Sequence, residues 1–409
     1  MRVTGVRTVL VTAPWTGDPF WLPGERFERT AALVVVETDE DLIGVGETIM
    51  GYFCAEVVTP LIDYFGGLMT ELDLDPRQPE VAFRELYQRS LWWARVGLGL
   101  SVLSGLEMAL WDIAGKAVGR PVHELIGGPA HDRLPLYASG GTGSWPVERA
   151  VEQARRYSSL GFRGLKIGTG FEGRPGGYTT APGSPPYGTW YAASTADRIA
   201  DERAKFGALR EALGSGIELA TDCHAVQVRE PWSRSTALDL ARALESFDLL
   251  FMEEPLRYDD PEGYAALRRA TRVPIAGGEC LTGVDEFRRY LDLDALDYVQ
   301  PDATHVGGIG VAREVARMAE SRHVGLIVHT GAAIGPGFMA NLHVAFASPN
   351  SRFVEYTLAP DNVRSELLSE PVTLADGFIE RPTAPGLGIT LDADFADRYP
   401  FRPGVVEYA

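Results

Sequence analysis

Five short apolar runs in this chain each end in a charged or ionisable residue, and these ends recur at nearly even intervals. The terminal residues are Asp222, Glu253, Glu279, Asp302 and His329, which are separated by 31, 26, 23 and 27 residues. One strand, one helix and two turns need about 30 residues, since a parallel barrel of eight such units takes roughly 250. Such barrels hold their active sites at the carboxyl ends of the strands. The spacing therefore predicts an α/β barrel whose mouth gathers these five side chains.

The rest of the chain divides around this barrel. Residues 1 to about 60 alternate apolar and polar side chains and predict a small antiparallel sheet, and residues 103–117 follow with helical periodicity. The pattern predicts an α+β domain over residues 1–128, the barrel over 129–372, and a C-terminal segment over 373–409 that packs back on the first domain.

Composition excludes several functional classes. The formal net charge is −18 and the sequence has no run rich in lysine and arginine, so we expect no nucleic-acid partner. Cys54, Cys223 and Cys280 form no CxxC pair, which is typical of a reducing compartment. The sequence has neither the apolar stretch of a signal peptide nor about 18 consecutive apolar residues, so we expect a cytoplasmic protein without a membrane partner. An anionic substrate would need a local cation.

Asp222, Glu253 and Glu279 end the third, fourth and fifth predicted barrel strands. Three neighbouring carboxylates repel one another by about 4 kcal/mol per close pair at an effective dielectric constant of 20, so a cation must lie between them. An all-oxygen trio suits a hard dication, and Mg²⁺ is the natural choice because it accepts few carboxylates and leaves positions for substrate oxygens. The alternative is that each acid pairs with a nearby lysine or arginine.

Two histidines are predicted to face this trio. His329 ends the seventh strand and Asp302 the sixth, so the two are neighbours at the mouth. A carboxylate that accepts one imidazole N–H fixes the tautomer and leaves the other nitrogen as a base near neutral pH. His224 follows Asp222 by two residues, and residues i and i+2 of a strand point to the same side. Because strands three and seven are opposite in a ring of eight, one imidazole can remove a proton while the other delivers one.

Lys166 and Glu355 end the second and eighth predicted strands. Lys166 is predicted to bind a substrate carboxylate or to act as a second base, with a solvated surface lysine as the alternative. Glu355 is predicted to hydrogen-bond the substrate carboxylate or the enolate formed from it. The sequence does not assign His305 to a class. Four other histidines are predicted to be packing or surface residues: His123, His131, His323 and His343.

The stretch from Ser104 to Gly128, SGLEMALWDIAGKAVGRPVHELIGG, resembles the signature of the mandelate racemase and muconate lactonizing enzyme branch of the enolase superfamily. Three further motifs extend the resemblance over nearly the whole chain: Glu253-Glu-Pro255, Gly278-Glu279 and Gln300-Pro-Asp-Ala-Thr-His-Val-Gly-Gly308. The resemblance implies a capping domain, completed by the C-terminal segment, over a modified (β/α)7β barrel. It also implies Mg²⁺ held by Asp222, Glu253 and Glu279, with a lysine or histidine base.

Within that branch, three motifs resemble the galactonate and mannonate dehydratases: Asp222-Cys-His224, Asp302-Ala-Thr-His305 and His329-Thr-Gly-Ala-Ala-Ile-Gly-Pro336. The resemblance makes the histidine after the first metal ligand the acid and the strand-seven histidine the base. Racemases of the branch usually carry Lys-x-Lys on strand two, with the second lysine catalytic, whereas this chain has Lys166-Ile-Gly168. Glycine cannot transfer a proton, which disfavours the two-base route of a racemase.

The resulting hypothesis is a hydro-lyase that uses Mg²⁺ to dehydrate a sugar acid, an aldonate or aldarate, to a 2-keto-3-deoxy acid. His329 takes the C2 proton and His224 protonates the departing 3-hydroxyl, while Lys166 and Glu355 complete the electrostatic environment. Two alternatives stay open. One is a racemase, epimerase or cycloisomerase that uses Lys166 and His329 on opposite faces, and the other is a non-catalytic protein that binds sugar acids. The resemblance further implies a homo-oligomer.

Substrate choice is predicted to depend on loops rather than on the barrel. Two segments are rich in glycine, proline and aromatic residues, residues 14–24 and 168–191, and both are typical of lids or inserts. Substrate identity is predicted to depend on the loop around Trp15, Phe20 and Trp21, on Tyr52 and Phe53, and on the insert with Tyr178, Tyr187 and Tyr191.

Overall fold

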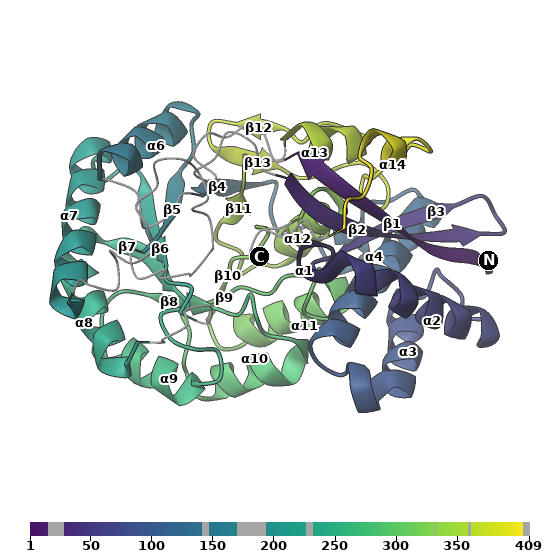
Figure 1. Cartoon of the computed structure of the whole chain (residues 1–409), viewed down its shortest axis with the longest axis horizontal. Helices are drawn as coiled ribbons and strands as arrows, with labels where there is room; N and C mark the ends of the chain where they lie inside the picture. The colour runs from purple at the N-terminus through teal and green to yellow at the C-terminus, as the bar shows by residue number, and fades with distance from the viewer. Residues whose placement is uncertain are drawn as a thin grey trace.

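The structure is a computed structural model, and it describes residues 1–14, 28–140, 147–169, 194–225, 232–331, 333–358 and 361–403. A ring of strands and helices occupies one side of the molecule and a smaller α+β unit the other, as Figure 1 shows. Most of the two predicted loop segments lies outside the described residues. This applies to Trp15, Phe20, Trp21, Tyr178, Tyr187 and Tyr191.

The α+β unit begins with an antiparallel sheet of order β1-β2-β3. Its strands are β1 (Val3–Pro14), β2 (Glu28–Thr38) and β3 (Ile43–Thr48). The helical part comprises α1 (Met50–Cys54), a 3-10 turn (Ala55–Val57), α2 (Val58–Glu71), α3 (Pro79–Ala94), α4 (Leu98–Val118) and α5 (Val122–Leu125). The predicted antiparallel sheet and the helix that follows it are both confirmed.

Helix α4 is the core of this unit. It ends at Gly119, whose φ of 65° is a left-handed conformation that glycine adopts without a steric penalty. Strand β3 lies so close to α4 that a Cβ on Gly46 would meet the carbonyl oxygen of Gly105 at 1.9 Å. Of the described helices, α4 alone has the length and apolar composition to cross a membrane, but 94% of that window is buried inside the fold.

The ring is a parallel barrel. Its strands are β4 (Arg133–Ser139), β5 (Gly164–Gly168), β6 (Glu218–Asp222), β7 (Leu249–Glu253), β8 (Ile275–Gly277), β9 (Tyr298–Val299), β10 (Gly325–Leu326) and β11 (Val354–Tyr356). Each strand from β4 to β10 pairs with the next in parallel, and β11 pairs with β4. A parallel bridge between Leu326 and Ser351 joins β10 to the start of the β11 segment and closes the ring. The predicted barrel is therefore confirmed, although several strands are shorter than their apolar runs.

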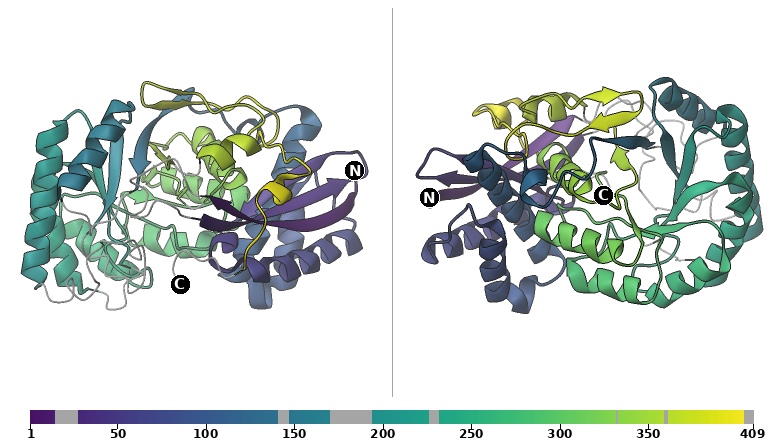
Figure 2. Two further views of the ribbon diagram at one scale, coloured as in Figure 1. Left: turned by 45° about the horizontal axis from the view of Figure 1, so that its top comes forward. Right: turned by 180° about the vertical axis from the view of Figure 1, so that it is seen from behind.

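Helices pack around the outside of the strands, as Figure 2 shows from two further sides. They are α6 (Val147–Ser159), α7 (Thr195–Leu213), α8 (Arg234–Leu244), a 3-10 turn (Glu245–Phe247), α9 (Pro261–Ala270), α10 (Gly283–Asp292), α11 (Gly308–Glu320) and α12 (Pro336–Ala347). Helix α7 starts with a capping box, in which the Ser194 hydroxyl and the Asp197 carboxylate each accept a backbone N–H of the other residue. The helix ends before Gly214.

The C-terminal part comprises α13 (Asp361–Leu367), β12 (Leu374–Ala375), β13 (Phe378–Glu380) and α14 (Phe395–Arg398). Strand β13 pairs antiparallel with β4 and extends the barrel sheet. Later residues contact the α+β unit, since Val122 N donates to Gly386 O and Val11 bridges Pro400. The segment thus contacts both units, and the three domain boundaries stay predictions.

Buried carboxylates of the α+β unit hold the barrel backbone. Glu47 accepts three backbone N–H groups from residues 334–337, at the start of α12, at 2.8 to 3.2 Å. Glu107 accepts two N–H groups from residues 309–310, in the first turn of α11. The first N–H groups of a helix have no partner within it, so these acids satisfy donors that would otherwise be buried without one. Burial raises the pKa of both carboxyls to about 7.

Candidate metal centre and active site

The three predicted metal ligands converge at the carboxyl end of the barrel. The strand register pairs Gly168 with Asp222 and Asp222 with Glu253, so the last residues of β5, β6 and β7 lie side by side. Glu279 lies two residues beyond β8. One oxygen from each of Asp222, Glu253 and Glu279 lies within 4.8 Å of the other two. This all-oxygen set fits a hard dication, as predicted from the sequence.

Lys166 lies against two members of this trio. Its Nζ is 3.1 Å from Asp222 Oδ2, 2.7 Å from Glu253 Oε1 and 3.1 Å from Glu355 Oε1. The lysine side chain is only 5% exposed, so it is not a solvated surface lysine. Among the described residues, no arginine forms an ion pair with the trio. The alternative that each acid pairs with a lysine or arginine holds for Asp222 and Glu253, which share Lys166, whereas no lysine or arginine of the described residues pairs with Glu279.

One ammonium does not balance the negative charge of this cluster. Burial and the charge of Asp222 raise the pKa of Glu253 well above its ordinary value. Burial opposes ionisation of Asp222 as well, but His224 and Lys166 lower the pKa of Asp222 to about 2. Because the pKa values of Glu253 and Asp222 shift in opposite directions, the protein alone does not stabilise both carboxylates in their charged form. A bound dication would stabilise the charged form of all the carboxylates in the cluster.

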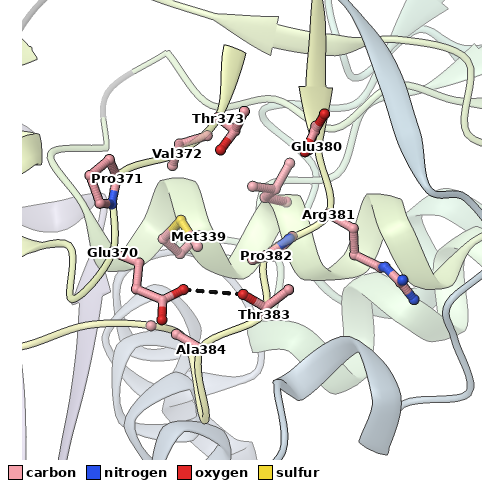
Figure 3. A pocket seen from close by; sticks show the side chains of 12 residues that line it. Met339, Glu370, Pro371, Val372, Thr373, Glu380, Arg381, Pro382, Thr383 and Ala384 are labelled. Atoms are coloured by element: carbon pink, nitrogen blue, oxygen red, sulfur yellow. Dashed lines mark hydrogen bonds between the residues drawn. The ribbon is translucent and has the colours of Figure 1, made fainter. Parts of the chain in front are cut away.

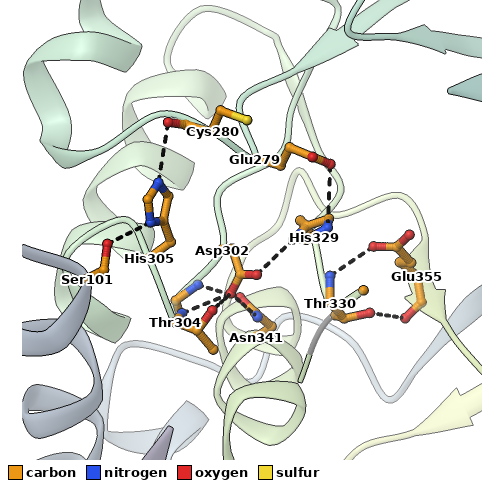
Figure 4. Close-up of polar contacts among 12 residues, drawn as sticks. Ser101, Glu279, Cys280, Asp302, Thr304, His305, His329, Thr330, Asn341 and Glu355 are labelled. Carbon is orange, nitrogen blue, oxygen red and sulfur yellow. Dashed lines mark hydrogen bonds and ion pairs between the residues drawn. The ribbon is translucent and has the colours of Figure 1, made fainter. Parts of the chain in front are cut away.

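His329 and Asp302 form the predicted pair. His329 Nδ1 lies 2.8 Å from Asp302 Oδ2, and Figure 4 shows the ring between Asp302 and Glu279. The opposite nitrogen, Nε2, is 3.4 Å from Glu279 Oε2. Three donors hold the other oxygen of Asp302, namely Thr304 N, Thr304 Oγ1 and Asn341 Nδ2, at 2.8 to 2.9 Å. The histidine is thus oriented with one nitrogen toward the carboxylate trio.

His224 reaches the trio by a different route from the one predicted. Strand β6 ends at Asp222, and His224 has a left-handed backbone with φ of 45°, so the i and i+2 alternation of a strand does not apply. The turn nevertheless brings Nε2 of His224 to 3.1 Å from Asp222 Oδ2. His224 and His329 therefore contact different members of the trio, and both carry a ring nitrogen at its edge.

Glu355 links the trio to the loop after His329. Its Oε2 accepts Thr330 N at 2.8 Å, and its carbonyl accepts the Thr330 hydroxyl. Burial opposes its ionisation, but Lys166 and His329 hold the pKa of Glu355 below its ordinary value. Glu355 is therefore an anion in contact with Lys166.

Sequence reasoning missed several residues that shape this site. Gln300 Nε2 donates to Glu253 Oε2 at 2.6 Å, and Thr304 and Asn341 hold Asp302. Gln300 and Thr304 lie two residues before and after the predicted Asp302, and this proximity could have identified them as site residues. Asn341 lies on α12, far from the predicted residues in sequence, and no such feature identifies it. His305 is also assigned now. Its Nδ1 lies 2.7 Å from Ser101 Oγ on α4 and its Nε2 3.3 Å from Cys280 O, so it joins the α+β unit to the barrel.

The remaining histidines lie away from the trio, as predicted. His123 and His343 are buried and stacked, with their Nδ1 atoms 3.1 Å apart. Burial lowers their pKa values to about 4 and about 3. His131 Nε2 lies 2.9 Å from Ser348 O, and His323 is exposed.

Two pockets in the described residues lie outside this site. One, of about 160 Å³, lies between α12 and the C-terminal segment, where Thr383 donates to Glu370 (Figure 3). The other, of about 490 Å³, lies between α3 and α11. None of the predicted catalytic or metal-binding residues lines either pocket.

Models of two known domain families match this chain. The model described as "Mandelate racemase / muconate lactonizing enzyme, N-terminal domain" matches residues 6–127. The model described as "Enolase C-terminal domain-like" matches residues 149–395, which is more than half of the chain.

Individual proteins match over most of their length. D-galactonate dehydratase of Ralstonia nicotianae is 33% identical over 367 residues, which is 87% of each chain. Among solved structures, the 3,6-anhydro-D-galactonate cycloisomerase of Zobellia galactanivorans is 27% identical, with a TM-score of 0.79 over 98% of this chain and 99% of that one. A racemase of Streptomyces coelicolor with bound magnesium is 26% identical, with a TM-score of 0.78 over 97% of this chain and 99% of that one.

Proposed function

The chain belongs to the mandelate racemase and muconate lactonizing enzyme family of enolase-like proteins, and on that premise we propose that it dehydrates a sugar acid. The proposal rests on the arrangement of the carboxylates and imidazoles at the mouth of the barrel. Three carboxylates converge within 4.8 Å, and two imidazoles contact different members of the trio. Elimination of water needs one base and one acid, which this arrangement supplies. The similarity to a D-galactonate dehydratase supports the same reaction class.

Asp222, Glu253 and Glu279 would hold Mg²⁺, the ion named for one of the similar racemase structures. The bound ion supplies positive charge that stabilises the negative charge developing beside the substrate carboxylate as C2 loses its proton. Lys166 adds a second, fixed positive charge at the same place, since its ammonium already contacts two of the ligands. A chain with net charge −18 repels an anionic substrate, and these two cations would provide the local positive charge that attracts it.

His329 is the proposed base. Asp302 engages Nδ1, which leaves Nε2, on the side of Glu279, to accept the C2 proton. Asp302 is in turn held by Thr304 and Asn341, so the ring is fixed before substrate binds.

His224 is the proposed acid. It lies on the Asp222 side of the trio, where its Nε2 can give a proton to the departing 3-hydroxyl. Loss of that hydroxyl as water leaves an enol, which becomes a 2-keto-3-deoxy acid by tautomerisation. Glu355 keeps Lys166 in place and needs no proton of its own.

A racemase, epimerase or cycloisomerase is the second candidate, favoured by the similar cycloisomerase structure. On that route Lys166 would act as a base opposite His329. Two observations count against it. The lysine is buried among three carboxylates that keep it protonated, and position 168 holds glycine in place of a second lysine.

The test is a panel of aldonates and aldarates incubated with the full-length protein and Mg²⁺, scored for 2-keto acids. A 2-keto-3-deoxy product supports the dehydratase. A product that only inverts at C2 overturns it in favour of the second candidate, and absence of turnover across the panel overturns both in favour of a binding protein. We also propose a homo-oligomer, which sedimentation velocity tests separately.

A further inference from the structure

A second group of possible metal ligands lies directly beside the trio. One ligand atom from each of Glu254, Glu279 and Cys280 lies within 4.8 Å of the other two. Glu279 is common to both groups, so the two groups share a carboxylate. The second group differs in chemistry, because it contains a thiol.

The side chains of this second group are built into the fold. Glu254 follows β7 with a left-handed backbone, φ 42°, and its backbone is held by Ala276 O and Ala225 N. The residue is 1% exposed, and its Oε2 is buried without a hydrogen-bond partner among the described residues. A buried carboxylate oxygen that accepts no hydrogen bond is costly, which points to a ligand as its partner.

The Cys280 backbone is fixed from the other side. Its carbonyl oxygen lies 3.3 Å from His305 Nε2, and Figure 4 shows the sulfur directed away from that histidine. The thiol contacts Glu254. The sulfur and both carboxylates therefore converge in one place, although they come from the loops after two different strands.

We propose that Glu254, Glu279 and Cys280 form a second dication site, which takes a thiophilic ion such as Zn²⁺ rather than Mg²⁺. Sulfur selects softer ions, and three protein ligands with one open position are a common zinc arrangement. The thiol gives its proton to solvent as the sulfur becomes a ligand. Because Glu279 cannot serve both ions fully, binding at one site weakens binding at the other by the same factor. Zinc is then an inhibitor that withdraws Glu279 from the catalytic centre.

The test uses Cd²⁺ as the probe, because a cadmium thiolate absorbs in the ultraviolet and reports on sulfur alone. Full-length, metal-free protein is titrated with Cd²⁺ and compared with three variants: Cys280→Ser, Glu254→Gln and, as the matched control, Cys54→Ser. Cys54 is also a free, partly exposed cysteine, but it lies on α1. We expect the absorption in the wild type and in Cys54→Ser, its loss in Cys280→Ser, and at least about a tenfold weaker affinity in Glu254→Gln.

Saturating Mg²⁺ should shift the Cd²⁺ titration of the wild type to higher concentration. Absorption that persists in Cys280→Ser, or that never forms in the wild type, overturns the proposal, and absorption unaffected by Mg²⁺ overturns the sharing of Glu279. Thermal unfolding of each variant separates loss of a ligand from loss of the fold. No step needs substrate or turnover, so failure of the dehydratase proposal leaves this result readable.

Discussion

Asp302 lies 2.8 Å from Nδ1 of His329 through one carboxylate oxygen, while its other oxygen accepts three hydrogen bonds. The three hydrogen bonds hold the Asp302 carboxylate in one orientation, and the carboxylate in turn holds the His329 ring. This contact places an N–H on Nδ1. Burial opposes protonation of the ring, but Glu279 and Asp302 raise the pKa of His329 well above its ordinary value, so Nε2 becomes the nitrogen with a free lone pair once a cation neutralises Glu279.

Replacing Asp302 by asparagine should invert that tautomer. The amide oxygen keeps the three donors, so the amide NH₂ faces Nδ1 and donates to it, which forces the proton onto Nε2. We expect kcat to fall by about 10²- to 10⁴-fold, the usual contribution of a general base, with little loss of thermal stability. The exposed Asp285→Asn is the control and should keep wild-type kcat. A variant with near-normal kcat contradicts the role of Asp302.

His329→Asn removes the proposed base itself. We expect loss of turnover by a similar factor, and also loss of exchange of the substrate C2 proton with solvent deuterium, measured by NMR. His323→Asn is the matched control, because His323 is exposed and has a left-handed backbone that asparagine tolerates. Full exchange in His329→Asn removes His329 from the role of base.

His224→Asn should separate the two half-reactions. Asparagine accepts the left-handed backbone at this position, φ 45°, so the turn after β6 is kept. The variant lacks the acid for the leaving group, and we expect dehydration to stop while C2 exchange continues. The same NMR experiment, run beside an assay for the 2-keto acid, measures both. Unimpaired product formation would make His224 a bystander.

Lys166→Met should strengthen Mg²⁺ binding while abolishing activity. The ammonium contacts two of the proposed ligands and therefore repels a dication bound there. Two unit charges of the same sign 4 Å apart repel each other by about 4 kcal/mol at an effective dielectric constant of 20. We expect at least about tenfold higher affinity by isothermal titration calorimetry. Lys205→Met is the control, since Lys205 is equally buried but pairs with Glu202 on α7. Weaker Mg²⁺ binding in Lys166→Met argues against the site.

The positions of the site residues along the chain were predictable because a barrel repeats. Each apolar run is one strand, and parallel pairing brings its end beside the end of its neighbour. The exact strand ends were not predictable. Asp302 and His329 lie three residues beyond β9 and β10, because an apolar pattern does not record where the hydrogen bonds of the ladder stop.

Contacts between distant parts of the chain left no pattern in the sequence. Asn341 reaches Asp302 from a helix 39 residues away, and Glu47 caps a turn 287 residues away. Nothing in the sequence near either residue indicates its partner, because the two groups meet only when the two units pack together. His224 shows the opposite case, because its contact was predicted but the backbone that makes it was not.

Glu107→Gln should change how stability depends on pH. Burial raises the pKa of Glu107 to about 7 from an unfolded value near 4.5, although the N–H groups of Gly310 and Ile309 oppose this. The folded state therefore binds the proton more tightly, so the contribution of this group is full below pH 4.5 and is lost as pH rises through 7. At 1.36 kcal/mol per pKa unit, the loss is at most about 3 kcal/mol.

Glutamine does not titrate, so the Glu107→Gln variant should lack this loss. It should be less stable than the wild type at pH 5 by about 1 to 3 kcal/mol, because an amide satisfies fewer of the backbone donors, and the gap should narrow by pH 8. Urea unfolding at pH 5, 6.5 and 8 measures it, with the exposed Glu85→Gln on α3 as the control that leaves the pH dependence unchanged. A gap that widens with pH would mean that the two N–H donors and Trp111 stabilise the charged carboxylate more than burial opposes it.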